Sequence, residues 1–216
     1  MEQGLIHAGL QTLFDMEFKL GRCKIAISPL FVCILCIMLL VDRTGIMLLG
    51  LISVVIHELG HFIFMIITKK RPESVSFQLG GIIIKSNGFS GYNNDFLIAM
   101  GGCLFNLIAF SFSSYFYYKT KSEMTMLFSA ANLGLFLFNL LPVSGLDGMD
   151  LIRIKLLKRF SIEKTNTICN VISILFLIFS LIVVVCLTIY KIINPTILIS
   201  LIYLLILTLI NIKNNS

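Results

Sequence analysis

Apolar runs long enough to cross a membrane follow one another along most of this 216-residue chain. A spanning helix needs about 20 mostly apolar residues, and six stretches meet or approach that length. They are 25–41, 46–67, 94–118, 124–141, 168–190 and 195–212. Only 13% of the residues are charged, whereas an average soluble domain has about a quarter. The sequence therefore predicts an all-α polytopic membrane protein with about six transmembrane helices.

Two stretches depart from the helical pattern and lie before the first and third predicted helices. Residues 16–27 nearly alternate apolar and polar side chains, which is typical of a strand, with a break at Gly21. Residues 75–85 are rich in β-formers around Gly80-Gly81. We expect short strand-like elements in both places. For the first stretch an interfacial amphipathic segment is the alternative, and the pattern leaves open whether the two stretches pair.

The apolar runs also predict the organisation of the chain. Residues 1–24 form an N-terminal interfacial or strand segment, 25–160 a membrane core of four helices, and 161–216 two C-terminal transmembrane helices. No cleavage site of small residues follows the first apolar run, so we expect that run to remain as a membrane anchor. A broken helix at membrane depth, such as the one ending at Pro142, is tolerated mainly where it lines a cavity or is buried in protein.

Basic residues are distributed unequally between the two predicted sides of the membrane. With the N-terminus inside, thirteen Lys and Arg residues fall on the inner side and four on the outer side. Short loops rich in Lys and Arg stay cytoplasmic, so both termini are expected in the cytoplasm. The net charge of +6 has the same origin. It lies in short clusters beside apolar runs and not in a basic stripe with aromatic residues, so no nucleic-acid partner is expected.

Ionisable residues interrupt the second apolar run. The stretch SVVIHELGHFIF, residues 53–64, contains His57, Glu58 and His61. Such groups are costly at membrane depth unless they are paired, bind a metal or face a polar cavity. Residues i and i+4 of a helix share one face, so the two histidines can bind one ion while the glutamate stays free to act on water. The pattern predicts half of a zinc site with a general base beside it.

A catalytic zinc usually has three protein ligands, so one more ligand must come from elsewhere. His7, the remaining histidine, lies in a polar N-terminal segment and is expected at the surface. Asp147 follows the broken fourth run between Gly145 and Gly148, where the chain can expose a side chain to a cavity. At about 1.5 Å per residue, His61 and Asp147 lie roughly 12 Å and 9 Å from the basic residues that follow them. This similar depth predicts Asp147 as the third ligand.

Further motifs follow the histidine pair in a recognisable order. Gly102 to Asn106 form a G-x-x-x-N element, Asn139 to Pro142 an N-x-x-P element, and Leu146-Asp147-Gly148 an L-D-G element. Together with HELGH, these motifs resemble the site-2 protease family of intramembrane zinc metalloproteases, over roughly residues 16–160. The short chain is most similar to the stage IV sporulation protein FB branch, whose members process a membrane-associated pro-sigma factor.

The resemblance implies one Zn²⁺ held by His57, His61 and Asp147, with Glu58 as the catalytic base. The expected activity is cleavage of a membrane-embedded or membrane-tethered protein near the cytoplasmic face, as in regulated intramembrane proteolysis. Before attack, a helical substrate must unwind locally, because a transmembrane helix buries its carbonyls in hydrogen bonds. The expected location is the lipid bilayer of a bacterial cell membrane.

The resemblance also assigns three residues to substrate binding. Asn139 would hydrogen-bond the extended substrate backbone, and Pro142 would fix the turn that presents Asp147. A helix-ending asparagine and a loop proline are the plainer interpretations of these two residues. For Asn106, an interhelical hydrogen bond is an equally good explanation.

Two departures from the family pattern stand out. Met149 follows Gly148 where the family segment often has a second glycine. Neither a PDZ domain nor a CBS domain is found, so we expect control by separate membrane regulatory proteins.

Two other functions are alternatives to proteolysis. A membrane metal transporter would need a metal path across the bilayer, but the outer halves of all six candidate helices lack His, Asp and Glu. An inactive protease-like scaffold would be expected to have lost Glu58, which is present. The sequence therefore favours an intramembrane zinc metalloendopeptidase.

Overall fold

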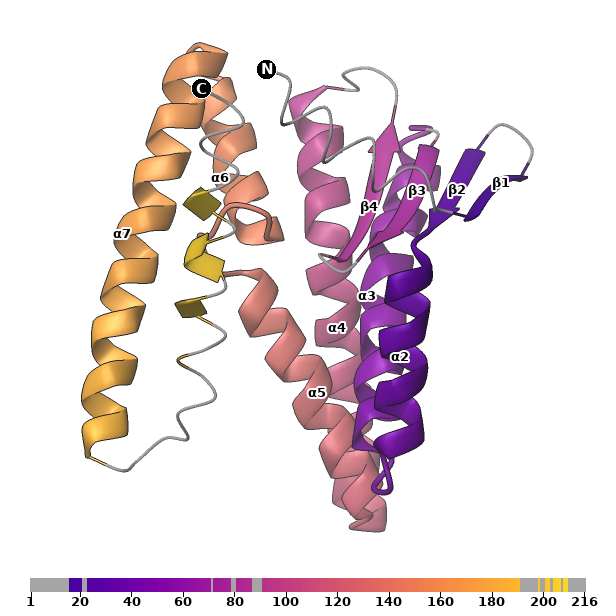
Figure 1. Ribbon diagram of the computed structural model, residues 1–216. Helices are drawn as coiled ribbons and strands as arrows, with labels where there is room; N and C mark the ends of the chain where they lie inside the picture. Colours follow the sequence, from indigo (N-terminus) through magenta and orange to yellow (C-terminus); the bar gives the residue numbers. More distant parts are fainter. Residues whose placement is uncertain are drawn as a thin grey trace.

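The computed structural model describes residues 16–20, 23–70, 72–78, 81–86 and 91–190, with isolated residues between 198 and 209. His7 lies outside the described residues, as does most of the predicted sixth helix, 195–212. The described helices are α2 (Pro29–Val41), α3 (Ile46–Ile67), α4 (Tyr92–Thr120), α5 (Glu123–Asn139), α6 (Asp147–Leu157) and α7 (Ile162–Ile189). The predicted all-α polytopic class is confirmed, since long apolar helices make up most of the described chain (Figure 1).

The helices differ in whether they can cross a membrane. Within the described residues, α3, α4 and α7 are long and apolar enough to do so. Helices α2 and α5 lie where spanning helices were predicted but have 13 and 17 residues, fewer than the roughly 20 that a bilayer requires. Helix α6 was not predicted, and α7 begins at Ile162, earlier than the predicted 168.

Both strand predictions are confirmed, and the strands join into one sheet. Strands β1 (Met16–Leu20), β2 (Cys23–Ile27), β3 (Pro72–Gln78) and β4 (Gly81–Ser86) follow one another in the order β1-β2-β3-β4. Strands β2 and β3 are parallel, whereas the outer pairs are antiparallel. Parallel neighbours need a crossover connection, which the α2–α3 helical hairpin provides. The sheet therefore lies at one end of that hairpin (Figure 1).

The tip of the α2–α3 hairpin is held by one carboxylate. Asp42 accepts hydrogen bonds from the backbone N–H groups of Gly45, Met47 and Leu48 at 3.0, 2.8 and 3.3 Å, and from the Thr44 hydroxyl at 2.8 Å. These donors include otherwise unpaired N–H groups at the start of α3. Partial desolvation alone would raise the pKa of Asp42, but the hydrogen bonds outweigh it and lower the pKa below its ordinary value.

Helices α3 and α4 approach each other closely at two glycines. A Cβ atom on Gly101 would lie 2.7 Å from the carbonyl oxygen of Gly60 and 2.9 Å from Phe64 Cδ2. A Cβ on Gly60 would in turn meet the carbonyl oxygen of Gly101. Small residues at membrane helix crossings let the backbones approach in this way. The crossing lies within the HELGH stretch and so brings α4 against the two histidines.

Candidate metal centre

Helix α3 presents its polar side chains on the face that turns toward the other helices. His57 is 6% exposed, and Ser53 and Gly60 are also buried. On the other side of the helix, Leu59 is 47% exposed and Val55 likewise, as expected for residues that meet lipid. The helical period therefore separates the histidine face from the apolar face.

The loop between α5 and α6 brings Asp147 to the same place. Gly145 has φ of 98°, a conformation that side-chain-bearing residues rarely adopt. A Cβ atom on Gly148 would meet the Leu140 carbonyl group and lie 2.7 Å from the Leu141 carbonyl oxygen. The glycine of the L-D-G element is therefore required by close backbone packing. Asp147 itself is the first residue of α6.

Met149 fits the structure although a glycine was expected there from the family pattern. Its side chain in α6 is fully buried, as is that of Val143 in the loop before that helix. Both apolar side chains belong to the buried core of the described residues. The departure from L-D-G-G therefore adds buried apolar contact beside the aspartate.

Helix α7 holds the loop from the other side. The Ser173 hydroxyl lies 3.0 Å from both the backbone N–H and the hydroxyl of Ser144. Ser173 is fully buried, and it belongs to a row of buried residues at four-residue intervals along α7. The row comprises Thr165, Cys169, Ser173 and Leu177. This face of α7 packs toward the loop that leads to Asp147.

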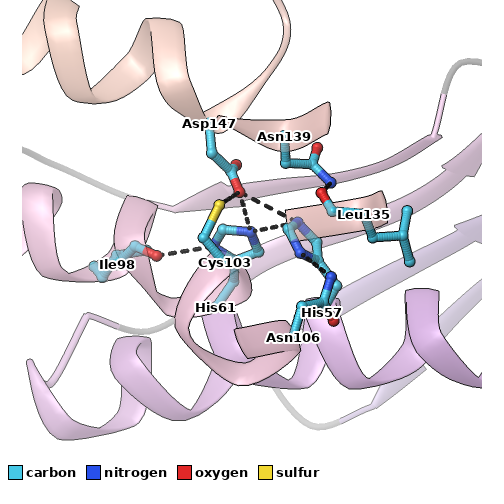
Figure 2. Close-up of polar contacts among 8 residues, drawn as sticks. All are labelled: His57, His61, Ile98, Cys103, Asn106, Leu135, Asn139 and Asp147. Atoms are coloured by element: carbon cyan, nitrogen blue, oxygen red, sulfur yellow. Dashed lines mark hydrogen bonds and ion pairs between the residues drawn. The ribbon is translucent and has the colours of Figure 1, made fainter. Parts of the chain in front are cut away.

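Three side chains from two distant parts of the chain converge (Figure 2). The Asp147 Oδ2 atom lies 3.2 Å from His57 Nε2 and 3.3 Å from His61 Nε2. The two Nε2 atoms are 3.2 Å apart. Donor atoms bound about 2.0 Å from one tetrahedral zinc stand about 3.3 Å apart, from the usual bond lengths. The donor types and their spacing therefore fit a Zn²⁺ ion with three protein ligands.

Contacts from α4 surround this cluster. The Ile98 carbonyl oxygen lies 2.8 Å from His61 Nδ1, and the Asn106 amide nitrogen lies 3.2 Å from His57 Nδ1. The Cys103 thiol donates a weak hydrogen bond of 3.5 Å to Asp147 Oδ2. Each of the three candidate ligands therefore has a partner on one helix, as Figure 2 shows.

Glu58 lies beside the cluster and outside the donor set. It is half-buried on α3, next to His57 in the sequence and three residues before His61. Its carboxylate is not among the groups that could hold the ion within the described residues. The glutamate therefore neighbours both histidines along α3 and is separate from the candidate ligands.

The three residues expected to bind substrate occupy different surroundings. Asn139 is the last residue of α5, and its amide donates to the Leu135 carbonyl at 3.1 Å. Pro142 lies in the half-buried loop between α5 and α6. Asn106 is fully buried and contacts His57. Asn139 and Pro142 lie on the segment that leads to Asp147, whereas Asn106 packs against His57 at its Nδ1 atom.

Hydrogen bonds at one end of the bundle align the helices that form the site. Lys70, just after α3, forms a 2.8 Å ion pair with Asp95 in the first turn of α4. At the start of α4, the Tyr92 hydroxyl donates to the Leu157 carbonyl at the end of α6 at 3.0 Å. Lys158 donates to the Asn93 amide oxygen at 3.0 Å. These contacts tie α3 and α6 to α4 at the end where both candidate ligand segments were expected to meet.

Several of these contacts were not anticipated. Ile98 contacts His61 through its backbone carbonyl. Because every residue has this group, the residue type cannot indicate such a contact. Cys103 and Ser173 lie within apolar runs, where small residues are common as packing. The four-residue spacing of Thr165, Cys169 and Ser173 is a signal that a search for small polar residues on one helix face would have found.

The fold and site define an all-α polytopic membrane protein with a candidate His-His-Asp metal centre between its helices. No protein-family model and no curated protein matches the chain. Among solved structures, it is similar to a Site-2 Protease from Methanocaldococcus jannaschii, with a TM-score of 0.65 and 19% identity. The likeness covers 89% of this chain and 93% of that one. The chain therefore shares the fold of that protease over nearly its whole length.

Proposed function

We propose that this protein is an intramembrane zinc metalloendopeptidase that cleaves membrane-embedded or membrane-tethered proteins near the cytoplasmic face. The observation that carries the proposal is the convergence of His57, His61 and Asp147 at 3.2–3.3 Å. The fold shared with a Site-2 Protease supports it. The adjacent Glu58 supports catalysis, since a site that only stored or transported the ion would not need a separate base.

In this proposal the ligands hold one Zn²⁺ through two imidazole nitrogens and one carboxylate oxygen. The chemistry that the ion supplies when bound is Lewis acidity, which lowers the pKa of water toward about 7. Glu58 accepts a proton from the attacking water and delivers one to the leaving amine of the cleaved peptide bond. Neutral His57 and His61 and ionised Asp147 keep the ligand set at one negative charge, which suits a divalent cation.

Substrate positioning is assigned to the segment that leads to Asp147. The amide of Asn139 hydrogen-bonds the extended backbone of the unwound substrate, and Pro142 fixes the turn before the aspartate. Both assignments come from the sequence motif. The half-buried position of both residues in that segment is compatible with them.

The proposed setting is a bacterial cell membrane with both termini in the cytoplasm, as the thirteen inner and four outer basic residues predict. The proposed division of the chain keeps residues 25–160 as the protease core. As the first substrate class to test we propose a membrane-associated pro-sigma factor, on the resemblance to the sporulation branch. Regulation is assigned to separate membrane proteins.

Co-expression with candidate membrane-tethered substrates tests the activity. Cleavage by the wild type should be lost in Glu58→Gln, which removes the base but keeps the size of the side chain. The matched control is Glu123→Gln, the same change in the exposed first turn of α5, which should cleave as the wild type does. Cleavage that survives Glu58→Gln would contradict the mechanism.

A further inference from the structure

One face of α4 lies against both histidines of the proposed zinc site. Ile98, Gly102 and Asn106 are spaced by four residues and therefore share a helix face. Ile98 contacts His61, Asn106 contacts His57, and Gly102 packs against both imidazoles. Through Ile98 and Asn106, this face reaches the Nδ1 atoms, which are not the nitrogens that face Asp147.

For His61 the chemistry of the partner determines the tautomer. A backbone carbonyl can only accept a hydrogen bond. The Ile98 carbonyl at 2.8 Å therefore requires the hydrogen on Nδ1 of His61. A neutral imidazole then has its lone pair on Nε2, the nitrogen that faces Asp147 and His57.

At His57 the neighbouring group is the side-chain amide of Asn106, which can either donate or accept a hydrogen bond. This partner alone therefore does not determine the tautomer. His57 must also present an Nε2 lone pair if it binds a metal beside Asp147, so its Nδ1 carries the hydrogen and needs an acceptor. Asn106 is the residue at that nitrogen, and it is fully buried. The Asn106 amide nitrogen lies 3.2 Å from His57 Nδ1. Its Oδ1 is buried with no hydrogen-bond partner among the described residues.

The two ends of an amide have nearly the same shape, so the chemistry of the neighbours assigns its orientation. With the amide turned by 180°, the oxygen accepts from Nδ1–H of His57 and is no longer without a partner. Hydrogen-bonded acceptors behind metal-binding histidines hold the ring and its tautomer in this manner.

We propose that Asn106 is a positioning residue whose amide oxygen accepts a hydrogen bond from His57 Nδ1 and keeps Nε2 available to zinc. The inference rests on the proposed function, because it takes His57 to be a zinc ligand. It replaces the expected contact of Asn106 with substrate. Its role is to orient a ligand from behind, away from the cleaved bond.

Zinc affinity of the purified full-length protein in detergent tests the inference without any need for a substrate. Affinity is measured by competition with a chromophoric chelator, on folded and monodisperse protein. Asn106→Leu, which removes the acceptor at similar volume, should bind zinc 10- to 100-fold more weakly, the usual effect of losing such a partner. The absorption spectrum of the Co²⁺-substituted protein should change as well.

The matched control is Asn132→Leu. Asn132 is equally buried on the neighbouring helix α5, but its amide donates to Ser53 and the Phe128 carbonyl at 3.0 and 2.9 Å. Its replacement should lower stability and leave zinc affinity within about twofold of the wild type. A purely structural effect of removing a buried amide would instead weaken zinc binding equally in both variants, which would overturn the proposal.

Asn106→Asp identifies the atom that acts. A carboxylate only accepts hydrogen bonds, so this variant should restore zinc affinity to within a few-fold of the wild type. If Asp weakens binding as much as Leu does, the amide nitrogen is the functional atom and the proposal is wrong. Wild-type protein that binds no zinc would overturn the proposed function itself, whereas tight binding by Asn106→Leu would overturn this inference alone.

Discussion

At the residue scale, the candidate site depends on a missing side chain as much as on its ligands. A Cβ atom on Gly102 would meet His61 Nε2 and would lie 2.7 Å from His57 Nε2. These are the atoms proposed to bind zinc, so the space beside them is open only because residue 102 is a glycine. Steric exclusion therefore explains the glycine at the start of the G-x-x-x-N element, and the contact with His57 explains the asparagine at its end.

Gly102→Ala is therefore expected to lower zinc affinity by more than 100-fold, because the methyl group would displace both imidazoles. Equilibrium zinc titration of the purified protein measures the loss. Gly134→Ala on α5 is the control, since a Cβ there has nothing within 4 Å and alanine favours a helix by up to about 1 kcal/mol. Wild-type zinc affinity in Gly102→Ala would contradict the assignment of the site.

The main residues of the site could be found in the sequence, and their partners could not. The spacing of His57 and His61 follows from the helical period, and the depth of Asp147 followed from the basic residues beyond it. The contact of Asn106 with His57 depends on how α4 is rotated about its axis. The hydropathy of an apolar run does not determine that rotation when most of its faces are apolar.

At the element scale, the segment with Asp147 is held by helices on both sides. Gly148 packs on the carbonyl groups of residues 140 and 141, and Ser173 on α7 binds the backbone and side chain of Ser144. From the sequence, this part of the chain was predicted only to form a transmembrane helix. The hydrogen bonds of Ser173 make α7 part of the support of the candidate metal centre.

Ser173→Ala should destabilise the protein by about 1 kcal/mol, the usual net value of a hydrogen bond, with more if the Ser144 N–H is left unpaired. It should also weaken zinc binding several-fold by loosening Asp147. Thermal unfolding and zinc titration measure the two effects. Ser180→Ala on the same helix is the control, because the Ser180 hydroxyl bonds the Phe176 carbonyl of its own helix. Identical results for the two variants would show that the loop does not depend on α7.

Elements with a strong local period were predictable, and those defined by pairing were not. Residues 16–27 alternate and formed β1 and β2, but the parallel pairing of β2 with β3 requires the return of the chain through α2 and α3. Helix α6 was not predicted because it is short and contains four charged residues, Asp147, Asp150, Arg153 and Lys155. These residues interrupt the apolar run that would have indicated a helix.

At the scale of the whole molecule, the candidate ligands come from segments far apart in the sequence. Helix α3 supplies two of them, and the start of α6, beyond two further helices, supplies the third. The class of protein and the meeting of these segments could be predicted, since hydropathy and the placement of basic residues limit the depth of each segment. The number of spans stays a prediction, because α2 and α5 have 13 and 17 residues, fewer than the roughly 20 that a bilayer requires. The cytoplasmic location of both termini stays a prediction from charge.

Because a bound ion would join α3 to α6, zinc is expected to stabilise the entire fold. A ligand that binds only the folded state stabilises it by about 4 kcal/mol at a free concentration 1,000 times its Kd. Treatment with a chelator should therefore lower the Tm of the wild type by several degrees, and added Zn²⁺ should restore it. Circular dichroism of the helical signal in detergent suits the measurement, since the chain has no tryptophan. In Asp147→Asn the ion loses its link to α6, so chelator and zinc should shift the Tm much less. A Tm shift in Asp147→Asn as large as in the wild type would mean that the ion does not bridge the two helices.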